Sequence, residues 1–247
     1  MRIISRLDIK GDNLIKGVQL EGLRVLGDPL EFARKYYFEG ADEIIYIDCV
    51  ASLYGQNHLH SLISDVSKST FIPTTVGGGV RSVEDIRKLL LTGADKVTIN
   101  TSAVQDPDLI QNASKEFGSQ CIVSSIQAKR IKPGHWNALI ENGREESGLD
   151  VLKWALKVQD LGAGEILLTS VDNDGTMGGL DFDLINKVNN IVDIPVIVSG
   201  GFCIDDVEKL ENNLINAIAI GSSLHYKKTS LKEVKDKLNQ KGIEVRM

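Results

Sequence analysis

An aspartate and a glutamine occupy corresponding places in the two halves of the chain, where proton-transfer chemistry could occur. Asp8 follows the apolar run Arg2–Leu7, and Gln127 follows the similar run Gln120–Ile126. A carboxylate at the rim of an apolar core can act as general acid or base, with a pKa set by its partial burial. A loop-forming role is the alternative for Asp8. A second carboxylate at position 127 would complete an acid/base pair, but the amide of Gln127 can hydrogen-bond and cannot transfer a proton.

Glycines and small polar residues follow strand-like runs in both halves and could bind anions. Such residues leave backbone N–H groups free to hold a phosphate. Their repetition favours two phosphate sites, and so a substrate with a phosphate at either end, over tight turns alone. The residues are Gly77, Gly78, Gly79, Asn100 and Thr101 in the first half, and Ser199, Gly200, Gly201, Gly221, Ser222 and Ser223 in the second.

Short apolar runs alternate with helical patterns along the chain. Continuous hydrophobicity is typical of strands covered on both faces, as in a parallel sheet. The predicted strands are Arg2–Leu7, Glu43–Ile47, Ile72–Val76, Lys96–Ile99, Gln120–Ile126, Glu165–Thr169, Pro195–Val198 and Ala217–Ile220. Capping residues and glycines bound the helical patterns, which are Leu30–Phe38, Ser82–Leu91, a helix opened by Asp106-Pro107, Gly148–Leu161, Asp181–Asn190, Ile204–Asn212 and Ser230–Gln240.

This alternation over 247 residues predicts one α/β domain, a (β/α)8 TIM barrel spanning residues 1–247. A doubly wound open sheet is the main alternative. The internal repeat, with half-barrels of about 1–118 and 119–247, favours the barrel because two half-barrels close into eight strands. In a barrel the functional groups gather where the strands end. That rule adds Asp48 and Ser170 to the candidate site.

Four charged residues lie at or near the starts of predicted strands. They are Arg2, Glu43, Lys96 and Glu165. In a barrel these positions form a ring at the end opposite the site. Two cations alternating with two anions can satisfy one another, so ion pairing without a further function is the simplest interpretation.

Composition excludes some classes of function. The chain is 42% hydrophobic and carries 28 Lys+Arg against 34 Asp+Glu, a net charge of −6. A nucleic-acid partner would call for a basic excess. The N-terminus lacks a signal-peptide pattern, and no apolar run approaches the ~20 residues of a membrane helix. Together with three cysteines in unrelated settings, this predicts a cytoplasmic protein with reduced thiols and no membrane partner.

Taken together, many segments of the chain resemble the cyclase subunit of imidazole glycerol phosphate synthase from end to end. The resemblance implies a barrel enzyme without cofactor or metal that accepts ammonia from a separate glutaminase subunit. It implies a bis-phosphorylated ribulosyl substrate, closure of an imidazole ring and release of an aminoimidazole carboxamide ribotide. The matching segments include Asp8-Ile9-Lys10, Lys16-Gly17, Gly27-Asp28-Pro29, Val76-Gly77-Gly78-Gly79, the stretch from Gly93 to Asn100, Phe117-Gly118-Ser119-Gln120, the stretch from Gly162 to Ser170, Asp172-Asn173-Asp174-Gly175-Thr176 and Ser199-Gly200-Gly201.

The resemblance also assigns roles to single residues. Asp8 matches the first catalytic aspartate, and Lys16 lies in a segment from which it could reach a phosphate. One phosphate site matches Gly79, Asn100 and Thr101, and the other matches Asp174, Gly175, Gly200, Gly201, Gly221 and Ser222. The charged ring matches the gate through which ammonia enters, and Asp95 matches a residue of the glutaminase docking surface.

The match breaks at the reaction centre. The family has a second catalytic aspartate where this chain has Gln127, and usually a cysteine where it has Arg6. This combination resembles a paralogous group whose subunits are thought to pass ammonia to a sugar amidotransferase for surface polysaccharides. Histidine biosynthesis is the first alternative, and a scaffold that only activates the glutaminase is the second. Arg6 could contact a substrate anion or point away from the mouth.

Three weaker features complete the expectations. The polar segment Lys132–Glu146 is expected to be a mobile flap over the mouth, and Lys10–Leu26 a second one. The pair His58 and His60 lacks a third ligand, so a zinc site is not expected there.

Overall fold

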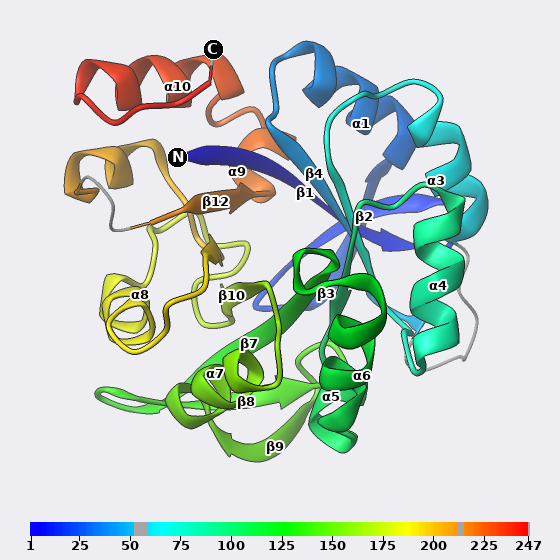
Figure 1. Cartoon of the computed structure of the whole chain (residues 1–247). Helices are drawn as coiled ribbons and strands as arrows, with labels where there is room; N and C mark the ends of the chain where they lie inside the picture. Colours follow the sequence, from blue (N-terminus) through cyan, green and yellow to red (C-terminus); the bar gives the residue numbers. More distant parts are fainter. Residues whose placement is uncertain (52–58, 212–214, 247) are drawn as a thin grey trace.

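The computed structural model describes residues 1–51, 59–211 and 215–246, and its parallel strands form a closed barrel (Figure 1). Within these ranges, eight parallel strands are hydrogen-bonded in the order β1-β4-β5-β6-β7-β10-β11-β12, and β12 pairs with β1. The (β/α)8 prediction is confirmed, and the open sheet is excluded. The strands are β1 (Arg2–Lys10), β4 (Glu43–Asp48), β5 (Thr74–Gly77), β6 (Lys96–Ile99), β7 (Ile122–Lys132), β10 (Glu165–Ser170), β11 (Val196–Ser199) and β12 (Ala217–Ile220).

Helices cover the outside of the barrel, and five of those described start at residues whose side chains cap them. Asp28 accepts the N–H of Leu30 at 2.7 Å, for example, and Ser82 accepts that of Asp85 at 3.1 Å, which satisfies N–H groups that a helix start leaves free. The longer helices are α1 (Pro29–Phe38), α3 (Leu59–Ser67), α4 (Val83–Thr92), α6 (Asp108–Phe117), α7 (Val151–Asp160), α8 (Phe182–Asn189) and α10 (Leu231–Gln240). The shorter ones are α5 (Thr101–Gln105), α9 (Ser222–His225) and the 3-10 turns η1 (Ser119–Cys121) and η2 (Ile204–Lys209). The helix predicted over Ile204–Asn212 is a 3-10 helix, Ile204–Lys209, in its described part.

Apolar side chains form two separate cores. The larger core lies between the strands and the surrounding helices. The smaller one fills the barrel interior and contains Ile4, Ile45, Val123, Leu167, Ile197, Ala217 and Ala219. Side chains alternate between the two faces of each strand, so the charged or polar residues before and after this inner layer also point into the barrel.

Two antiparallel hairpins extend the barrel strands. β2 (Asn13–Val18) and β3 (Glu21–Gly27) continue from β1, and β8 (His135–Ile140) and β9 (Glu145–Asp150) continue from β7. The expected flap Lys132–Glu146 is thus largely strand. Trp136 anchors it, since its side chain is 1% exposed and its indole N–H donates to Asp181 at 3.3 Å. Each predicted half of the chain thus contributes one such hairpin, the first on β1 and the second on β7.

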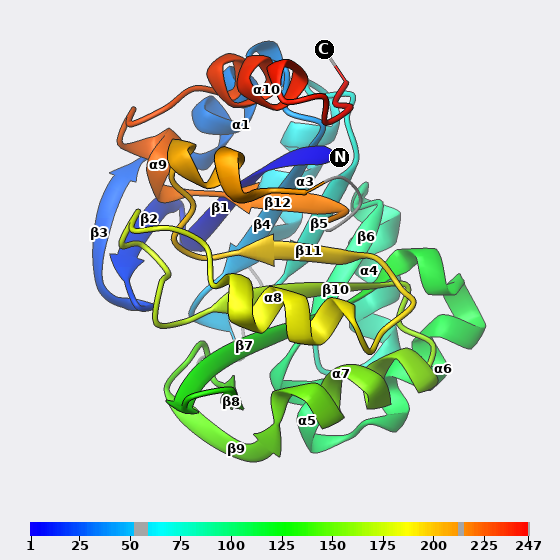
Figure 2. The same cartoon turned by 90° about the vertical axis from the view of Figure 1, so that its left-hand side faces the viewer.

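The barrel has two distinct ends. In Figure 2 the arrow of β11 points toward the side on which β2, β3 and α9 lie, while the N-terminus lies at the other side. The mouth is the end with the hairpins, and the base is the end with Arg2. Among the described residues, no helix is long and apolar enough to cross a membrane.

Candidate functional site

A cavity of about 410 Å³ opens at the mouth beside β4, β5, β6 and β7. It brings together six residues that the sequence predicts for the site, and Glu141, the residue after β8, also lines it. The lining residues that bear on the chemistry are Asp48, Gly78, Gly79, Thr98, Asn100, Thr101 and Gln127.

Backbone geometry explains the glycines of this cavity. Gly78 has φ +106°, and a Cβ there would lie 2.3 Å from the carbonyl oxygen of Asp48. Gly79 has φ +68°, and its Cβ would lie 2.7 Å from that of Ala51. Only glycine fits such a close approach of two loops. Asp48 stabilises the facing loop, because its Oδ1 accepts the N–H groups of Val50 and Ala51, both at 3.0 Å.

Asn100 and Thr101 tie the second hairpin to this cavity. The Asn100 amide donates to the carbonyl of Leu139 at 3.1 Å. The Thr101 hydroxyl accepts the N–H of Glu141 at 3.0 Å. Both side chains therefore hold the wall of the cavity, which these two residues line together with Gly79.

Gln127 lies at the inner wall of the cavity. Its side chain is 5% exposed, and its Oε1 has no hydrogen-bond partner among the described residues. A buried acceptor without a partner is costly, so this amide is free to receive an N–H or O–H from a bound molecule. In the β7–β10 ladder Gln127 is opposite Thr169.

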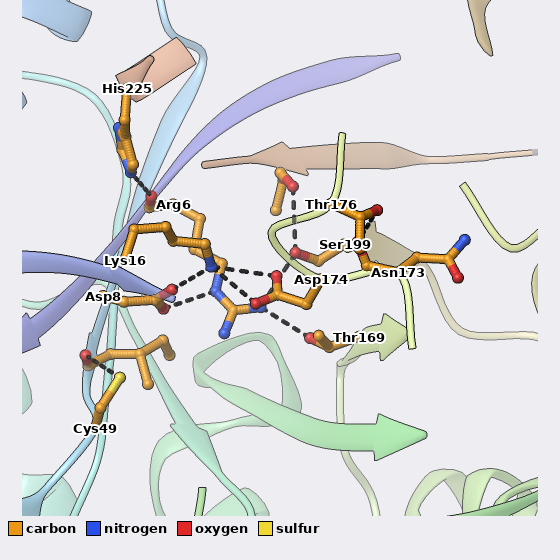
Figure 3. A network of polar contacts seen from close by, with 12 residues as sticks. Arg6, Asp8, Lys16, Cys49, Thr169, Asn173, Asp174, Thr176, Ser199 and His225 are labelled. Atoms are coloured by element: carbon orange, nitrogen blue, oxygen red, sulfur yellow. Dashed lines mark hydrogen bonds and ion pairs between the residues drawn. The ribbon is translucent and has the colours of Figure 1, made fainter. Parts of the chain in front are cut away.

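Asp8 lies at the centre of a buried ionic network (Figure 3). The Lys16 ammonium contacts Asp8 at 2.6 Å and Asp174 at 3.0 Å, and the Arg6 Nε contacts Asp8 at 2.9 Å. All four side chains are at most 5% exposed. Two cations and two carboxylates thus balance one another inside the mouth.

Arg6 crosses the barrel interior and does not point away from the mouth. Its Nη1 donates to Thr169 Oγ1 at 2.9 Å and to Ser199 Oγ at 3.1 Å (Figure 3). His225 contacts the backbone of Arg6, and its Nε2 lies 3.1 Å from the Arg6 carbonyl oxygen. Sequence reasoning missed Thr169, Ser199 and His225 as partners of Arg6, although the first two lie at the predicted strand ends.

These contacts determine the protonation of the network. Burial disfavours the charge on Asp8, but attraction to Arg6 and Lys16 outweighs it and holds the pKa of this carboxyl well below its usual range. Burial likewise disfavours the charges on Arg6 and Lys16, yet nearby Asp8 and Asp174 raise the pKa of both. Asp8 therefore stays ionised above its ordinary pKa near 4. In this arrangement it is a carboxylate held between two cations.

The second predicted phosphate cradle is assembled but nearly full. Its open space is about 10 Å³, roughly the volume that one water requires. Gly200 has φ +99°, and a Cβ there would lie 2.5 Å from the carbonyl oxygen of Ser170. The hydroxyls of Ser170 and Ser222 have no partner among the described residues. The cradle is lined by Arg6, Lys16, Asp174, Gly175, Ser199, Gly200, Gly201, Gly221 and Ser222.

The charged ring at the base forms as predicted. Arg2 contacts Glu43 at 2.6 Å and Glu165 at 2.7 Å. Lys96 contacts the same two carboxylates at 3.2 Å and 2.9 Å. Each cation thus bridges both anions across the barrel. Burial opposes the charge on Arg2, but Glu165 and Glu43 raise its pKa.

Two other predicted positions have structural contacts. The carboxylate of Asp95, beside the ring, accepts the N–H of Thr74 at 2.7 Å and so fixes the start of β5. His58 lies outside the described residues, and His60 Nδ1 is 3.1 Å from the Thr92 hydroxyl.

Comparison with known proteins gives a consistent result. The family model described as "Histidine biosynthesis protein" matches residues 2–230. A Legionella pneumophila protein named "Imidazole glycerol phosphate synthase subunit HisF" is 56% identical over 201 residues, which cover 81% of this chain and 95% of the relative. A protein of the same name from Prochlorococcus marinus (strain AS9601) is 49% identical over 250 residues, covering 100% of this chain and 98% of the relative.

Proposed function

Because the chain belongs to the family of HisF subunits of imidazole glycerol phosphate synthase, we propose that it is the ammonia-using synthase subunit of a two-chain glutamine amidotransferase. A glutaminase would dock at the base, where the ring and Asp95 lie. The substrate would be a phosphorylated small molecule bound at the mouth.

The observation that carries this proposal is the ion-paired ring at one end of a barrel whose other end holds a glycine-lined cavity. A ring of four groups that bridge one another can open by separating one cation from its two carboxylates. Beyond the ring lies the inner apolar layer, with Ile4, Ile45 and Val123. A neutral molecule such as ammonia crosses an apolar layer far more easily than an ion does.

Polar atoms mark the end of that path. The hydroxyls of Thr75 and Thr98 are buried and have no partner among the described residues. Thr98 also lines the 410 Å³ cavity with Gln127. Ammonia that leaves the apolar layer on this side would reach the substrate beside the Gln127 amide, with the substrate phosphate held by Gly79, Asn100 and Thr101.

The reaction supported best is the one for which the relatives are named, ring closure to imidazole glycerol phosphate. Asp8 would act as the carboxylate or base, and Gln127 would orient the substrate by hydrogen bonding. Loss of one general acid or base typically lowers the rate ~10²–10⁴-fold. We therefore propose a slow cyclase, and placing a carboxylate at position 127 would restore its rate.

One observation favours a second candidate. Arg6 is ion-paired with Asp8, and the amide of Gln127 cannot transfer a proton, so the chain lacks the family's acid/base pair. The charged ring at the base, by contrast, has all four of its residues. Such a subunit could pass nitrogen to a sugar amidotransferase for surface-polysaccharide synthesis. A scaffold that only activates the glutaminase is the remaining alternative, and it predicts that Asp8→Asn leaves every activity of the complex unchanged.

The test compares the purified wild-type chain with Gln127→Asp and Gln127→Asn, using the ribulosyl substrate and an ammonium salt. The slow-cyclase proposal predicts measurable wild-type turnover, a rise of about 10² or more in Gln127→Asp, and no rise in Gln127→Asn. Undetectable turnover in all three proteins would contradict the cyclase proposal and favour amidation of another acceptor.

A further inference from the structure

A buried lysine of α10 lies close to the start of β1, at the base of the barrel. The side chain of Lys235 is 5% exposed. Its ammonium donates to the carbonyl of Gly40 at 2.7 Å, to Asp42 Oδ1 at 2.8 Å and to the carbonyl of Arg246 at 2.6 Å. A lysine ammonium has three N–H donors, so its full donor capacity is used. Lys235 therefore joins the turn between α1 and β4 to the C-terminal segment.

The carboxylate of Asp42 extends this contact to β1. Its Oδ2 accepts the N–H of Ile3 at 2.6 Å, and the N–H of Asp42 donates to the carbonyl of Ile3 at 2.9 Å. Asp42 directly precedes Glu43, and Ile3 directly follows Arg2. These two hydrogen bonds therefore fix the backbone of one ring residue, Arg2, relative to that of another, Glu43.

The C-terminal segment holds the other neighbour of Arg2. The ammonium group of Met1 donates to the carbonyl of Glu244 at 2.6 Å. Ile243 and Val245 are buried, so this segment is packed against the body of the protein. Figures 1 and 2 both show the marked chain ends near each other, beside α10. The residues on either side of Arg2 are thus held by groups that the buried lysine organises.

The position of the Arg2 backbone matters for the ring. Arg2 is the more exposed ring cation, with a side chain 29% exposed against 15% for Lys96. Its guanidinium reaches Glu43 at 2.6 Å and Glu165 at 2.7 Å. Hydrogen bonds weaken steeply with distance and angle, so a small shift of the start of β1 would separate Arg2 from one carboxylate. Lys96 starts β6, which β4 and β5 separate from β1, and would keep its place.

We propose that Lys235 is a positioning residue for the charged ring. By neutralising Asp42 it keeps that carboxylate on the N–H of Ile3, and so keeps Arg2 in contact with both glutamates. A ring held in this way closes the base against bulk water. This rests on the proposed function in making the ring the entrance for ammonia, and its loosening would let ammonia from the glutaminase escape.

Amide hydrogen exchange of the full chain, followed by NMR, tests the positioning without any turnover. In Lys235→Met the Asp42 carboxylate loses its buried cation and turns toward water, which frees the N–H of Ile3. Exchange at Ile3 should then rise at least about tenfold more than exchange at Val97 on β6. Lys232→Met, on the same helix but exposed, is the matched control and should change either amide by less than about twofold.

Asp42→Asn is a milder variant that keeps the size of the side chain. It removes the charge that Lys235 neutralises and leaves a single oxygen to be shared between the lysine and the N–H of Ile3. Exchange at Ile3 should rise at least about threefold more than at Val97. This variant decides the outcome if Lys235→Met does not fold.

Nitrogen transfer provides the functional measurement. The complex with the glutaminase would receive glutamine labelled with nitrogen-15 in the amide and an excess of unlabelled ammonium. Lys235→Met should lower the share of product nitrogen that comes from glutamine at least about threefold. Ammonium-dependent turnover of the chain alone should stay within about twofold, because the mouth lies at the other end of the barrel. A purely structural loss would lower both activities by the same factor.

Three results would overturn the proposal: equal rises in exchange at Ile3 and Val97, no change at Ile3, or an unchanged glutamine share in Lys235→Met. A wild-type complex that transfers no label contradicts the proposed function instead, and the exchange measurement still decides whether Lys235 positions the start of β1.

Discussion

Removing the Arg6 guanidinium tests the ionic network at the mouth. In Arg6→Met, Asp8 loses a 2.9 Å contact in a site where both side chains are at most 5% exposed. Leaving one partner of a buried pair uncompensated costs about 3–5 kcal/mol. Two hydrogen bonds, to Thr169 and Ser199, are lost as well, while Lys16 still holds Asp8 at 2.6 Å. We expect the free energy of unfolding to fall by about 3–4 kcal/mol.

The assay is urea unfolding followed by fluorescence of the two tryptophans, with Asp8→Asn and the double variant completing a cycle. The double variant should be more stable than the sum of the single effects predicts, by about 2 kcal/mol. Lys10→Met, on the same strand but exposed, is the control and should change stability by less than about 0.5 kcal/mol. A loss under about 1 kcal/mol for Arg6→Met, or additive single effects, would refute the buried-pair argument.

Three further predictions concern stability and use the same unfolding assay. Burial lowers the pKa of His225 to about 4, so the folded protein binds fewer protons than the unfolded chain between pH 4 and 6.5. The free energy of unfolding should therefore fall by up to about 1.4 kcal/mol per pH unit on acidification through that range. His225→Gln should remove this pH dependence, and an unchanged dependence in the variant would contradict the assignment to His225. Gly78→Ala should cost about 2–4 kcal/mol because its Cβ would meet a carbonyl oxygen, whereas Gly148→Ala, with positive φ but open space, should cost about 1 kcal/mol; equal costs would contradict the steric reasoning. Lys96→Met should cost about 1–2 kcal/mol, less than Arg6→Met, because the ring is partly exposed.

The barrel could be predicted because its signals are local. The strands Lys96–Ile99 and Ala217–Ile220 were predicted with the bounds they have in the structure, since each is a short apolar run with polar flanks. The ring could be predicted for the same reason, as register in a closed barrel places strand starts together.

The second hairpin and the network at the mouth could not be predicted this way. Lys132–Glu146 has turn glycines and polar residues, and only its pairing with β7 and the burial of Trp136 make it a strand pair. The contacts of Lys16 with Asp174 and of Arg6 with Thr169 join residues far apart in sequence. No periodicity encodes them, so the low pKa of Asp8 follows only from the assembled structure.

Transfer of ammonia through the barrel is tested most directly with isotopes. The chain and its glutaminase would be supplied with glutamine labelled with nitrogen-15 in the amide, an excess of unlabelled ammonium and the phosphorylated acceptor. Passage from the ring to the mouth predicts that the nitrogen product carries the glutamine label far above its share of the total ammonia. A product whose label matches the bulk ammonia pool would contradict it.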